Sequence, residues 1–387
     1  MSSASIVIAG GGVMGASVAY HLARRGWKDL LILERANRPG AGSTGRSTGG
    51  FRSQHSTDVH VRLSRLSLEK LLAFSDETGV DPGYVAAGYL WLASTRQEML
   101  PLREALRVQR AAGLLEACEV GVEEIVSINP HLFLGDIVGG CFCPSDGFVQ
   151  PMRILEGYLR AAEGLGARVE WGQEIVDLEL GPGGRIGRVI TARGEVACQA
   201  VVNAAGPWAG LLARMAGIEI PVEPARRQVA VTRPFDALPA TMPMTLFAAN
   251  GFHLRVRDGK VLLLRPDPPT AGDLPDAPVA PEWAGSVFEE GCARLPVLRE
   301  TSIDAASCWA GLYEMSPDHH CLLGAVEECE NFYLINGSSG HGVMHAPALG
   351  QLLAEIISDG KAATLDASPL RPSRFAEGRP NPCSMLL

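Results

Sequence analysis

The sequence predicts an α/β fold, α+β overall, with one domain assembled from non-contiguous segments and a second, β-rich domain formed by the inserts between them. Strand and helix patterns alternate at the start, in the middle and at the end of the chain, and two β-rich stretches separate them. The 387 residues, 47% hydrophobic and 20% charged, can also bury a large core. We expect residues 1–80, 147–215 and 312–387 in the first domain and residues 81–146 and 216–311 in the second.

The chain begins with the pattern of a βαβ unit. An apolar run at 6–9 predicts a buried strand, and a glycine-rich turn follows at 10–15. Residues 16–25 have the spacing of an amphipathic helix, and a second apolar run at 30–33 is closed by Glu34. This order predicts a Rossmann-like start to the first domain.

The remaining elements are predicted from apolar residues repeating with the helical period of about 3.6 residues or with the strand period of about two. Helices are expected at 59–79, 97–113, 151–165 and 343–358. Strands are expected at 84–93, 138–143 and 332–335, in a strand-rich stretch at 167–203, and as short runs at 228–232, 252–256 and 261–264. The residues from 216 to 310 hold short β-like runs, which a proline-rich stretch at 266–281 interrupts.

A segment rich in Gly, Ser, Thr and Arg occupies residues 37–57, directly after the second strand. This composition suits either a flexible linker or a loop that wraps a ligand. A linker here would interrupt a domain. We therefore favour the ligand-wrapping loop.

The charge balance excludes several classes of partner. Lys and Arg total 34 against 43 Asp and Glu, for a formal charge of -9, which argues against nucleic acid and anionic lipid as partners. Nine cysteines without a C-x-x-C pair predict reduced thiols rather than a disulfide framework or a metal site. No stretch reaches the roughly 18–20 apolar residues of a membrane span. We expect a cytoplasmic protein without a membrane span or a metal.

The glycine turn fits G-x-G-x-x-G through Gly10, Gly12 and Gly15. It follows a strand and opens a helix, whose N-terminal amides suit a phosphate. Glu34, nineteen residues after Gly15, is placed to accept from a ribose hydroxyl and would repel a 2′-phosphate. The context predicts dinucleotide binding rather than a glycine turn without a ligand, and leaves FAD and NAD open.

Motifs spread over nearly the whole chain extend this pattern. They are GGGVMG (10–15) with Glu34, GSTGRSTGGFRSQ (42–54), PSDGFVQPMR (144–153), VVNAAGPWA (201–209), GLYEMSPDHHCLLG (311–324), GSSGHGVMHAPALG (337–350) and SPLRPSRF (368–375). Through them the chain resembles the FAD-dependent D-amino-acid oxidase, glycine oxidase and sarcosine oxidase superfamily. The GHG-x-M-x-A-P form and the tail are most similar to the beta subunits of heterotetrameric sarcosine oxidase and dye-linked L-proline dehydrogenase.

The resemblance implies an FAD-binding domain, a β-rich substrate-binding domain, and oxidation of the C–N bond of an amino acid or N-substituted amino acid. Hydride would pass to flavin N5, and the imine would hydrolyse. The turn at 336–342 and the helix after it would stabilise negative charge on reduced flavin. The residues expected to bind FAD are Gly10, Gly12, Val13, Met14, Gly15, Glu34, Arg35, Ser43, Thr44, Arg46, Ser47, Ile175, Ala205, Gly206, Trp208, Gly340, Gly342, Val343 and Met344.

Four residues are candidates for catalysis or substrate binding. Arg52 aligns with an arginine that holds the substrate carboxylate in similar sarcosine oxidases, the alternative being a solvated loop charge. Tyr313 matches a tyrosine that lines the family's pocket, and His253 is on a β-like run expected to face it, the alternatives being a core aromatic and a surface histidine. His341 belongs to the GHG signature. Should Arg52 be an ordinary loop charge, the next candidates are Arg46, Arg255 and Arg227.

The chain departs from monomeric sarcosine oxidases at three positions. Met344 stands where they have a second carboxylate-binding lysine, and Gly311 where a cysteine tethers the flavin. Their oxygen-activating lysine has no clear counterpart, because Lys260 falls in a turn. We therefore expect non-covalent FAD and slow reaction with oxygen. The adjacent His319, His320 and Cys321 predict a polar turn rather than a metal site.

The sequence is compatible with two alternatives. The same fold could oxidise a non-amine substrate such as a hydroxy acid or glycerol phosphate. The chain could also be a flavoprotein subunit of a larger dehydrogenase complex, or form a homo-oligomer. The sequence leaves the electron acceptor undefined.

Overall fold

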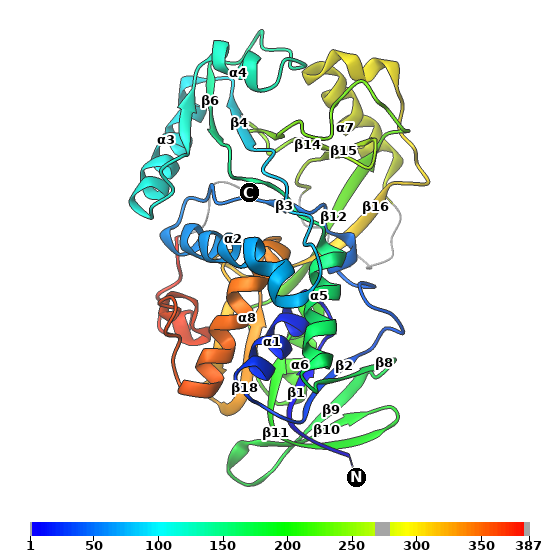
Figure 1. The fold of residues 1–387 in the computed structure, drawn as a ribbon, viewed down its shortest axis with the longest axis vertical. Coiled ribbons are helices and arrows are strands. Elements are labelled where there is room, and N and C mark those ends of the chain that lie inside the picture. The colour runs from blue at the N-terminus through cyan, green and yellow to red at the C-terminus, as the bar shows by residue number, and fades with distance from the viewer. Residues whose placement is uncertain (1, 268–278, 383–387) are drawn as a thin grey trace.

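Two large sheets organise the computed structural model, which describes residues 2–267 and 279–382 (Figure 1). The first sheet and its helices form the lower half of Figure 1, and the second sheet forms the upper half. The expected proline-rich stretch at 266–281 lies largely outside the described residues. No helix in the described ranges has the length and apolar character needed to cross a bilayer.

The first sheet has the order β17-β18-β11-β1-β2-β8, with β10 on β11 and β9 on β10. Its strands are β1 (Ser2–Ala9), β2 (Leu30–Glu34), β8 (Arg168–Trp171), β9 (Ile175–Leu180), β10 (Ile186–Thr191), β11 (Gly194–Asn203), β17 (Leu322–Val326) and β18 (Cys329–Asn336). The pairs of β1 with β2 and β11, of β2 with β8 and of β11 with β18 are parallel. The chain therefore leaves β1 towards β2 and later returns on the other side as β11, which makes a topological switch point at β1.

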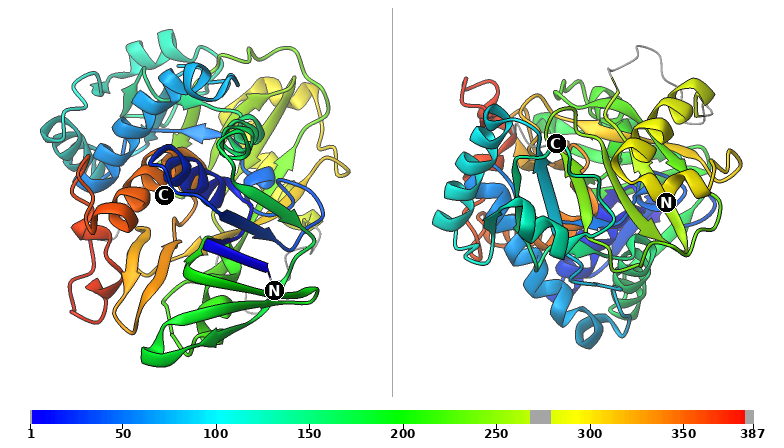
Figure 2. Two further views of the ribbon diagram at one scale, coloured as in Figure 1. Left: turned by 60° about the horizontal axis from the view of Figure 1, so that its bottom comes forward. Right: turned by 90° about the horizontal axis from the view of Figure 1, so that it is seen from above.

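Alternation along β1 divides the core of this half into two layers. Ile6 and Ile8 pack against the helices α1 (Val13–Arg24), α5 (Pro151–Gly164) and α8 (Gly342–Asp359). Val7 and Ala9 point to the opposite face, which β9, β10 and α6 (Ala209–Met215) cover. A strand buried on both faces explains the continuous apolar run of the sequence. The helix α2 (Asp58–Thr78) packs against α8 (Figure 2).

The second sheet has the order β16-β12-β15-β14-β13-β4-β6-β5. Its strands are β4 (Tyr89–Ala93), β5 (Cys118–Val120), β6 (Gly139–Cys143), β12 (Glu223–Val231), β13 (Met244–Phe247), β14 (His253–Arg257), β15 (Lys260–Leu264) and β16 (Trp309–Met315). The helices α4 (Val122–Ile128) and α7 (Pro281–Arg294) cover one face and α3 (Arg96–Ala111) the other. A two-stranded pair, β3 (Gly50–Phe51) with β7 (Gly147–Phe148), lies apart from both sheets. Short 3-10 turns complete the described chain at Thr44–Arg46, Pro182–Gly184, Gly206–Trp208, Pro296–Glu300, Ser368–Leu370 and Pro372–Arg374.

Most expected elements are present, and two expectations are wrong. The strand expected at 84–93 is confined to β4, because Gly88 takes a φ of +83° and breaks the extended run. The region 216–310 is not purely β-like, since it contains α7, whose proline at the first helical position starts the helix. The expected domain boundaries stay a prediction, although β16 extends across the one at 311–312.

Candidate active site

The carboxyl ends of four parallel strands lie together at one edge of the first sheet. The segments that follow β1, β2, β11 and β18 begin at Gly10, Arg35, Ala204 and Gly337. They line a cavity of about 820 Å³, whose opposite wall is formed by residues of β12, β14 and β16. A crevice outside the strand ends at a switch point is where open α/β sheets bind ligands. All the predicted site residues except Gly15 line this cavity.

A side chain at Gly10 or Gly15 would clash with the backbone in and around the glycine turn. Gly10 takes a φ of +112°, and a Cβ there would lie 2.3 Å from the carbonyl oxygen of Ala204. A Cβ on Gly15 would lie 2.0 Å from the Gly10 carbonyl oxygen, so Gly15 supports the turn from behind. The helix α1 starts after Gly12 without a side-chain cap, and Val13 N–H donates to Thr44 Oγ1 at 3.1 Å.

Glu34 is fixed by backbone donors at the end of β2. Its carboxylate accepts from the Gly11 and Ala36 N–H groups, each at 2.8 Å. The Arg35 guanidinium lies 3.6 Å from the centre of the Trp208 ring. These three side chains and Ile175 line one part of the cavity together.

The segment 37–57 is a structured wall of the cavity, not a linker. Four hydrogen bonds join this segment to strands of the second sheet. They run from Ser43 Oγ to Leu312 O (2.7 Å), from Trp309 Nε1 to Arg46 O (2.9 Å), from Arg255 Nη1 to Thr48 O (2.8 Å) and from Arg257 Nη1 to Ser47 O (3.1 Å). Arg255 is thereby a structural residue, with its guanidinium 3.5 Å from the centre of the Phe148 ring.

Arg52 is 4% exposed, which excludes a solvated loop charge. Its guanidinium donates to Gln54 O at 3.2 Å and contacts His341 Nε2 at 3.0 Å. Because a guanidinium has only donors, His341 Nε2 accepts, and the ring proton of neutral His341 is on Nδ1. Burial lowers the pKa of Arg52, against the opposing influence of Tyr89 and Asp146.

Asp146 positions the backbone next to Arg52. This fully buried carboxyl accepts from Ser53 N–H at 2.5 Å and from Gln54 N–H at 3.3 Å. Burial raises the pKa of Asp146 to about 7, although these hydrogen bonds oppose the rise. Sequence reasoning did not select this residue, although it lies in the quoted PSDGFVQPMR motif.

Five imidazoles pack behind Arg52 as a buried histidine cluster. The cluster contains His55, His60, His320, His341 and His345, with neighbouring ring centres 3.8–5.7 Å apart. The rings of His60 and His320 stack at 3.8 Å and 4°. Burial lowers the pKa of His55 and His60 well below the usual value and that of His345 to about 3. His55, His60 and His345 are therefore neutral at pH 7. Within 2–267 and 279–382, no group of three or more His, Cys, Asp or Glu is arranged to hold a metal ion.

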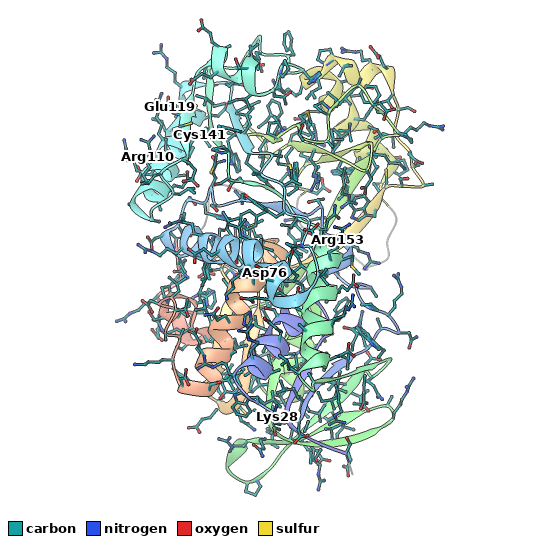
Figure 3. All side chains as sticks on the ribbon, viewed as in Figure 1. Lys28, Asp76, Arg110, Glu119, Cys141 and Arg153 are labelled. Atoms are coloured by element: carbon teal, nitrogen blue, oxygen red, sulfur yellow. The ribbon has the colours of Figure 1, made fainter. Side chains whose placement is uncertain are left out.

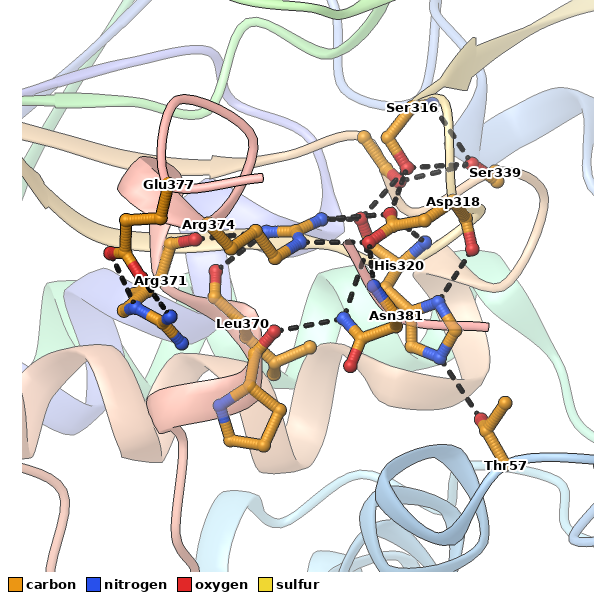
Figure 4. Close-up of polar contacts among 12 residues, drawn as sticks. Thr57, Ser316, Asp318, His320, Ser339, Leu370, Arg371, Arg374, Glu377 and Asn381 are labelled. Atoms are coloured by element: carbon orange, nitrogen blue, oxygen red, sulfur yellow. Dashed lines mark hydrogen bonds and ion pairs between the residues drawn. The ribbon is translucent and has the colours of Figure 1, made fainter. Parts of the chain in front are cut away.

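His320 connects the cluster to the C-terminal tail (Figure 4). Its Nε2 contacts Thr57 Oγ1 at 3.0 Å, and its carbonyl oxygen accepts from Arg374 Nη2 at 2.9 Å. Arg374 is fully buried and pairs with Asp318 through Nε to Oδ2 (2.8 Å) and Nη2 to Oδ1 (2.9 Å). Burial alone would raise the pKa of Asp318, but this pair holds it well below its usual value. Through Arg374, the motif at 368–375 therefore holds in place the turn that contains His320.

Tyr313 and His253 line the cavity from the second sheet. The Tyr313 side chain is 37% exposed, and a Cβ on Gly340 would lie 2.4 Å from its ring. His253 Nδ1 contacts Gly251 O at 2.8 Å, so Nδ1 carries the proton and Nε2 holds the lone pair. Burial lowers the pKa of His253 to about 4. Tyr313 is therefore not a packed core aromatic residue, and His253 is not a surface histidine.

Sequence reasoning missed Glu314 on the same wall. Burial raises its pKa to about 7, and its Oε1 accepts from Ser338 N–H at 3.3 Å. Its Oε2 is buried and has no hydrogen-bond partner among residues 2–267 and 279–382. The residue lies inside the quoted GLYEMSPD motif, but the motif gives no sign of its burial.

Neither the missing oxygen-activating lysine nor Gly311 is replaced by another reactive group of the described residues on the cavity wall. The four lysines are all described, and none lines the cavity; Lys260 Nζ instead pairs with Asp304 at 3.0 Å. Lys28 is at the far end of the first half (Figure 3). Gly311 lies on the cavity wall, where a Cβ would be 3.1 Å from Arg46 Cβ. No cysteine of the described ranges lines the cavity.

The lining fits the expected FAD. Gly10, Gly11 and Gly12 present backbone to the cavity beside the start of α1, which suits a pyrophosphate. The start of α8 also lines the cavity and has no side-chain cap, so its N–H groups and positive helix end suit the flavin pyrimidine. Glu34 suits a ribose hydroxyl.

Comparison with known proteins agrees with this fit. A model of the family described as FAD dependent oxidoreductase matches residues 5–356. Mitochondrial sarcosine dehydrogenase from Homo sapiens is 29% identical over 384 residues, covering 93% of this chain and 40% of that protein. The structure of L-proline dehydrogenase from P. horikoshii matches with 28% identity and a TM-score of 0.90, covering 98% of this chain and 100% of that one. Glycine oxidase from Bacillus cereus matches with 25% identity and a TM-score of 0.79, covering 93% and 96%.

The chain thus spans less than half the length of the sarcosine dehydrogenases that it matches. The family model, in contrast, covers most of the chain. The chain belongs to the family of FAD-dependent oxidoreductases, with FAD as its cofactor.

Proposed function

We propose that this chain oxidises the C–N bond of an amino acid or an N-substituted amino acid to an imine, which water then hydrolyses. The observation that carries the proposal is the buried cation Arg52 on the wall of the FAD-fitting cavity. A guanidinium binds a carboxylate through paired N–H donors, and it does so most strongly where water is excluded. The names of the similar proteins, which include sarcosine dehydrogenase, L-proline dehydrogenase and glycine oxidase, support an amino-acid substrate.

Three of the four candidate residues have a task in this reaction. Arg52 binds the substrate carboxylate and so fixes the carbon next to nitrogen. His341 holds the guanidinium through Nε2. The neutral His253, with its lone pair on Nε2, can accept a hydrogen bond from the N–H of the substrate amine, which must be neutral before its carbon gives up hydride. FAD, when bound, supplies the two-electron acceptor at N5.

An anaerobic bleaching panel tests the proposal. The FAD-loaded protein is mixed without oxygen with amino acids, N-methyl amino acids, 2-hydroxy acids and glycerol phosphate, and the flavin absorbance is followed. We expect the amines to bleach the flavin and the hydroxy compounds to leave it oxidised. Bleaching by a hydroxy acid or glycerol phosphate alone would assign the chain to non-amine chemistry. Chains that co-purify with the protein would reveal a larger complex.

A further inference from the structure

A second arginine faces the same cavity from the opposite wall. In the register of β12 on β16, Arg227 pairs with Gly311 and Ala225 pairs with Tyr313. Residues directly opposite each other in an antiparallel pair share a face, so Arg227 is on the face of Gly311 and Tyr313, both of which line the cavity. The Arg46 side chain, not Arg227, packs over Gly311, and Arg227 extends along the same cavity wall. The Arg227 guanidinium carbon is 5.6 Å from the centre of the Tyr313 ring.

Three other cations of this half of the described chain have carboxylate partners that Arg227 lacks. Lys260, Arg265 and Arg294 pair with Asp304, Glu290 and Asp136 at 2.8–3.0 Å. Arg227 Nη1 donates to the carbonyl oxygen of Arg226 at 2.9 Å, and no carboxylate of the described ranges forms an ion pair with it.

The acidic groups near Arg227 are otherwise engaged. Asp267 Oδ2, beside the strand, accepts from Gln228 Nε2 at 2.8 Å. Glu314, on the neighbouring strand, is held by Ser338 N–H, and burial raises its pKa to about 7. The cation Arg46 also lies on this wall and packs against Gly311. A cation without a paired carboxylate on a cavity wall favours an anionic ligand.

The charges of both Arg227 and Arg52 influence the Tyr313 side chain. Burial raises the pKa of its hydroxyl, and the positive charges of Arg227 and then Arg52 oppose the rise, so both cations act on one side chain of the cavity. Two cations that line one cavity and both act on the same aromatic residue can each take one carboxylate of the same small molecule. An amino acid with a single carboxylate engages only one of them.

We infer that Arg227 is a second carboxylate-binding residue and that the preferred substrates are amino acids carrying a second carboxylate, either on the nitrogen substituent or on the side chain. This inference rests on the proposed function. It deepens that function, because Arg52 would recognise every amino-acid substrate, whereas Arg227 would distinguish the dianionic ones from the rest.

Binding is measured first, with ligands that cannot be oxidised. Diglycolate and methoxyacetate are ethers of similar shape, with two carboxylates and one, and neither has an amine. Each is titrated into the FAD-loaded full chain, and the flavin absorbance spectrum and the melting temperature report occupancy. We expect diglycolate to bind at least tenfold more tightly than methoxyacetate, which corresponds to about 1.4 kcal/mol.

Substitutions then locate the preference. Arg227→Gln should bring the two dissociation constants within threefold, and Arg52→Ala should weaken both ligands while keeping their ratio. Arg233→Gln is the matched control, because Arg233 is exposed beyond the end of β12 and does not line the cavity. A wild-type ratio below threefold, or a tenfold ratio that survives Arg227→Gln, would overturn the inference.

Turnover separates this inference from the proposed function. The anaerobic panel is extended with N-(carboxymethyl)glycine for the nitrogen substituent, aspartate and glutamate for the side chain, and N-methylalanine for a single carboxylate. Faster bleaching by either dianionic class, lost in Arg227→Gln, supports the inference and says which position carries the second carboxylate. Equal bleaching by N-methylalanine, unaffected by Arg227→Gln, overturns the inference and leaves the proposed function intact. Selective diglycolate binding without bleaching by any amine overturns the proposed function instead.

Discussion

Replacing Arg52 by alanine gives the most direct test of substrate recognition. The side chain is 4% exposed and lines the cavity, so a carboxylate bound to it would be largely removed from water. Removing one member of such a desolvated pair costs about 2–5 kcal/mol, whereas a solvated pair contributes only about 0–1 kcal/mol. Since 1.4 kcal/mol corresponds to a factor of ten, Arg52→Ala should lower kcat/KM for a carboxylated amine by about 30-fold or more.

The assay compares three variants at one pH. Arg52→Ala and Arg52→Lys are measured with the substrate that bleaches the flavin fastest, and lysine should recover only part of the loss because a point charge cannot form the paired contact. Arg62→Ala is the control, because Arg62 pairs with Asp58 on the exposed surface of α2. The FAD spectrum and the melting temperature show whether the loss of the Arg52 contacts to His341 and Gln54 disturbs the fold.

A small effect would refute this reasoning. If Arg52→Ala lowers kcat/KM by less than about threefold, or about 0.65 kcal/mol, Arg52 does not bind the substrate carboxylate. An equal loss with a substrate that lacks a carboxylate would also refute it, since the arginine would then act on the fold or on FAD.

Further predictions concern the cofactor, the acceptor, the tail and pH. Acid precipitation should release free FAD, because Gly311 has no side chain to bond it; yellow colour left in the pellet would contradict this. Reduced flavin should react faster with an artificial dye than with oxygen, because no lysine lines the cavity, and equal rates would refute that. Asp318→Asn should lower the free energy of unfolding by about 3–5 kcal/mol, because it leaves Arg374 buried without its partner charge; a denaturation midpoint equal to that of wild type would oppose it. Stability should fall as the pH drops below about 6.5, because the unfolded histidines of the buried cluster take up protons first, each worth about 1.4 kcal/mol per pH unit, and a melting temperature at pH 5 equal to that at pH 7.5 would count against this.

The pH prediction has two opposing contributions. The folded pKa values of His55, His60 and His345 lie below the unfolded value, so acid favours the unfolded chain. Burial raises the folded pKa values of Asp146 and Glu314 to about 7, so their protonation favours the folded chain as the pH falls through 7. The shifted histidines of the cluster outnumber the two carboxyls, and the net effect of acid is destabilisation.

The first half of the fold was readable from sequence because its signals are local. Gly10 and Gly15 occur where a Cβ would strike backbone, and the burial of β1 on both faces gives a continuous apolar run. The second sheet was less readable, because its pairs join distant residues: Tyr89 on β4 pairs with Met244 on β13. The helix α7 was missed because its buried face is made of small residues such as Ala284 and Gly291, which give a weak apolar pattern.

The charged residues of the site could also be predicted from sequence only in part. A motif can indicate that Arg52 is near the substrate, but the carboxyl that fixes its backbone, Asp146, is 94 positions later in the sequence and acts on the N–H groups of Ser53 and Gln54. These hydrogen bonds engage both oxygens of Asp146, and burial raises its pKa to about 7, so it is only a partial counter-charge. The pKa of Arg52 accordingly stays lowered by burial. A substrate carboxylate entering the cavity would pair with this buried guanidinium, and its binding energy would come from a cation whose position the fold has already fixed.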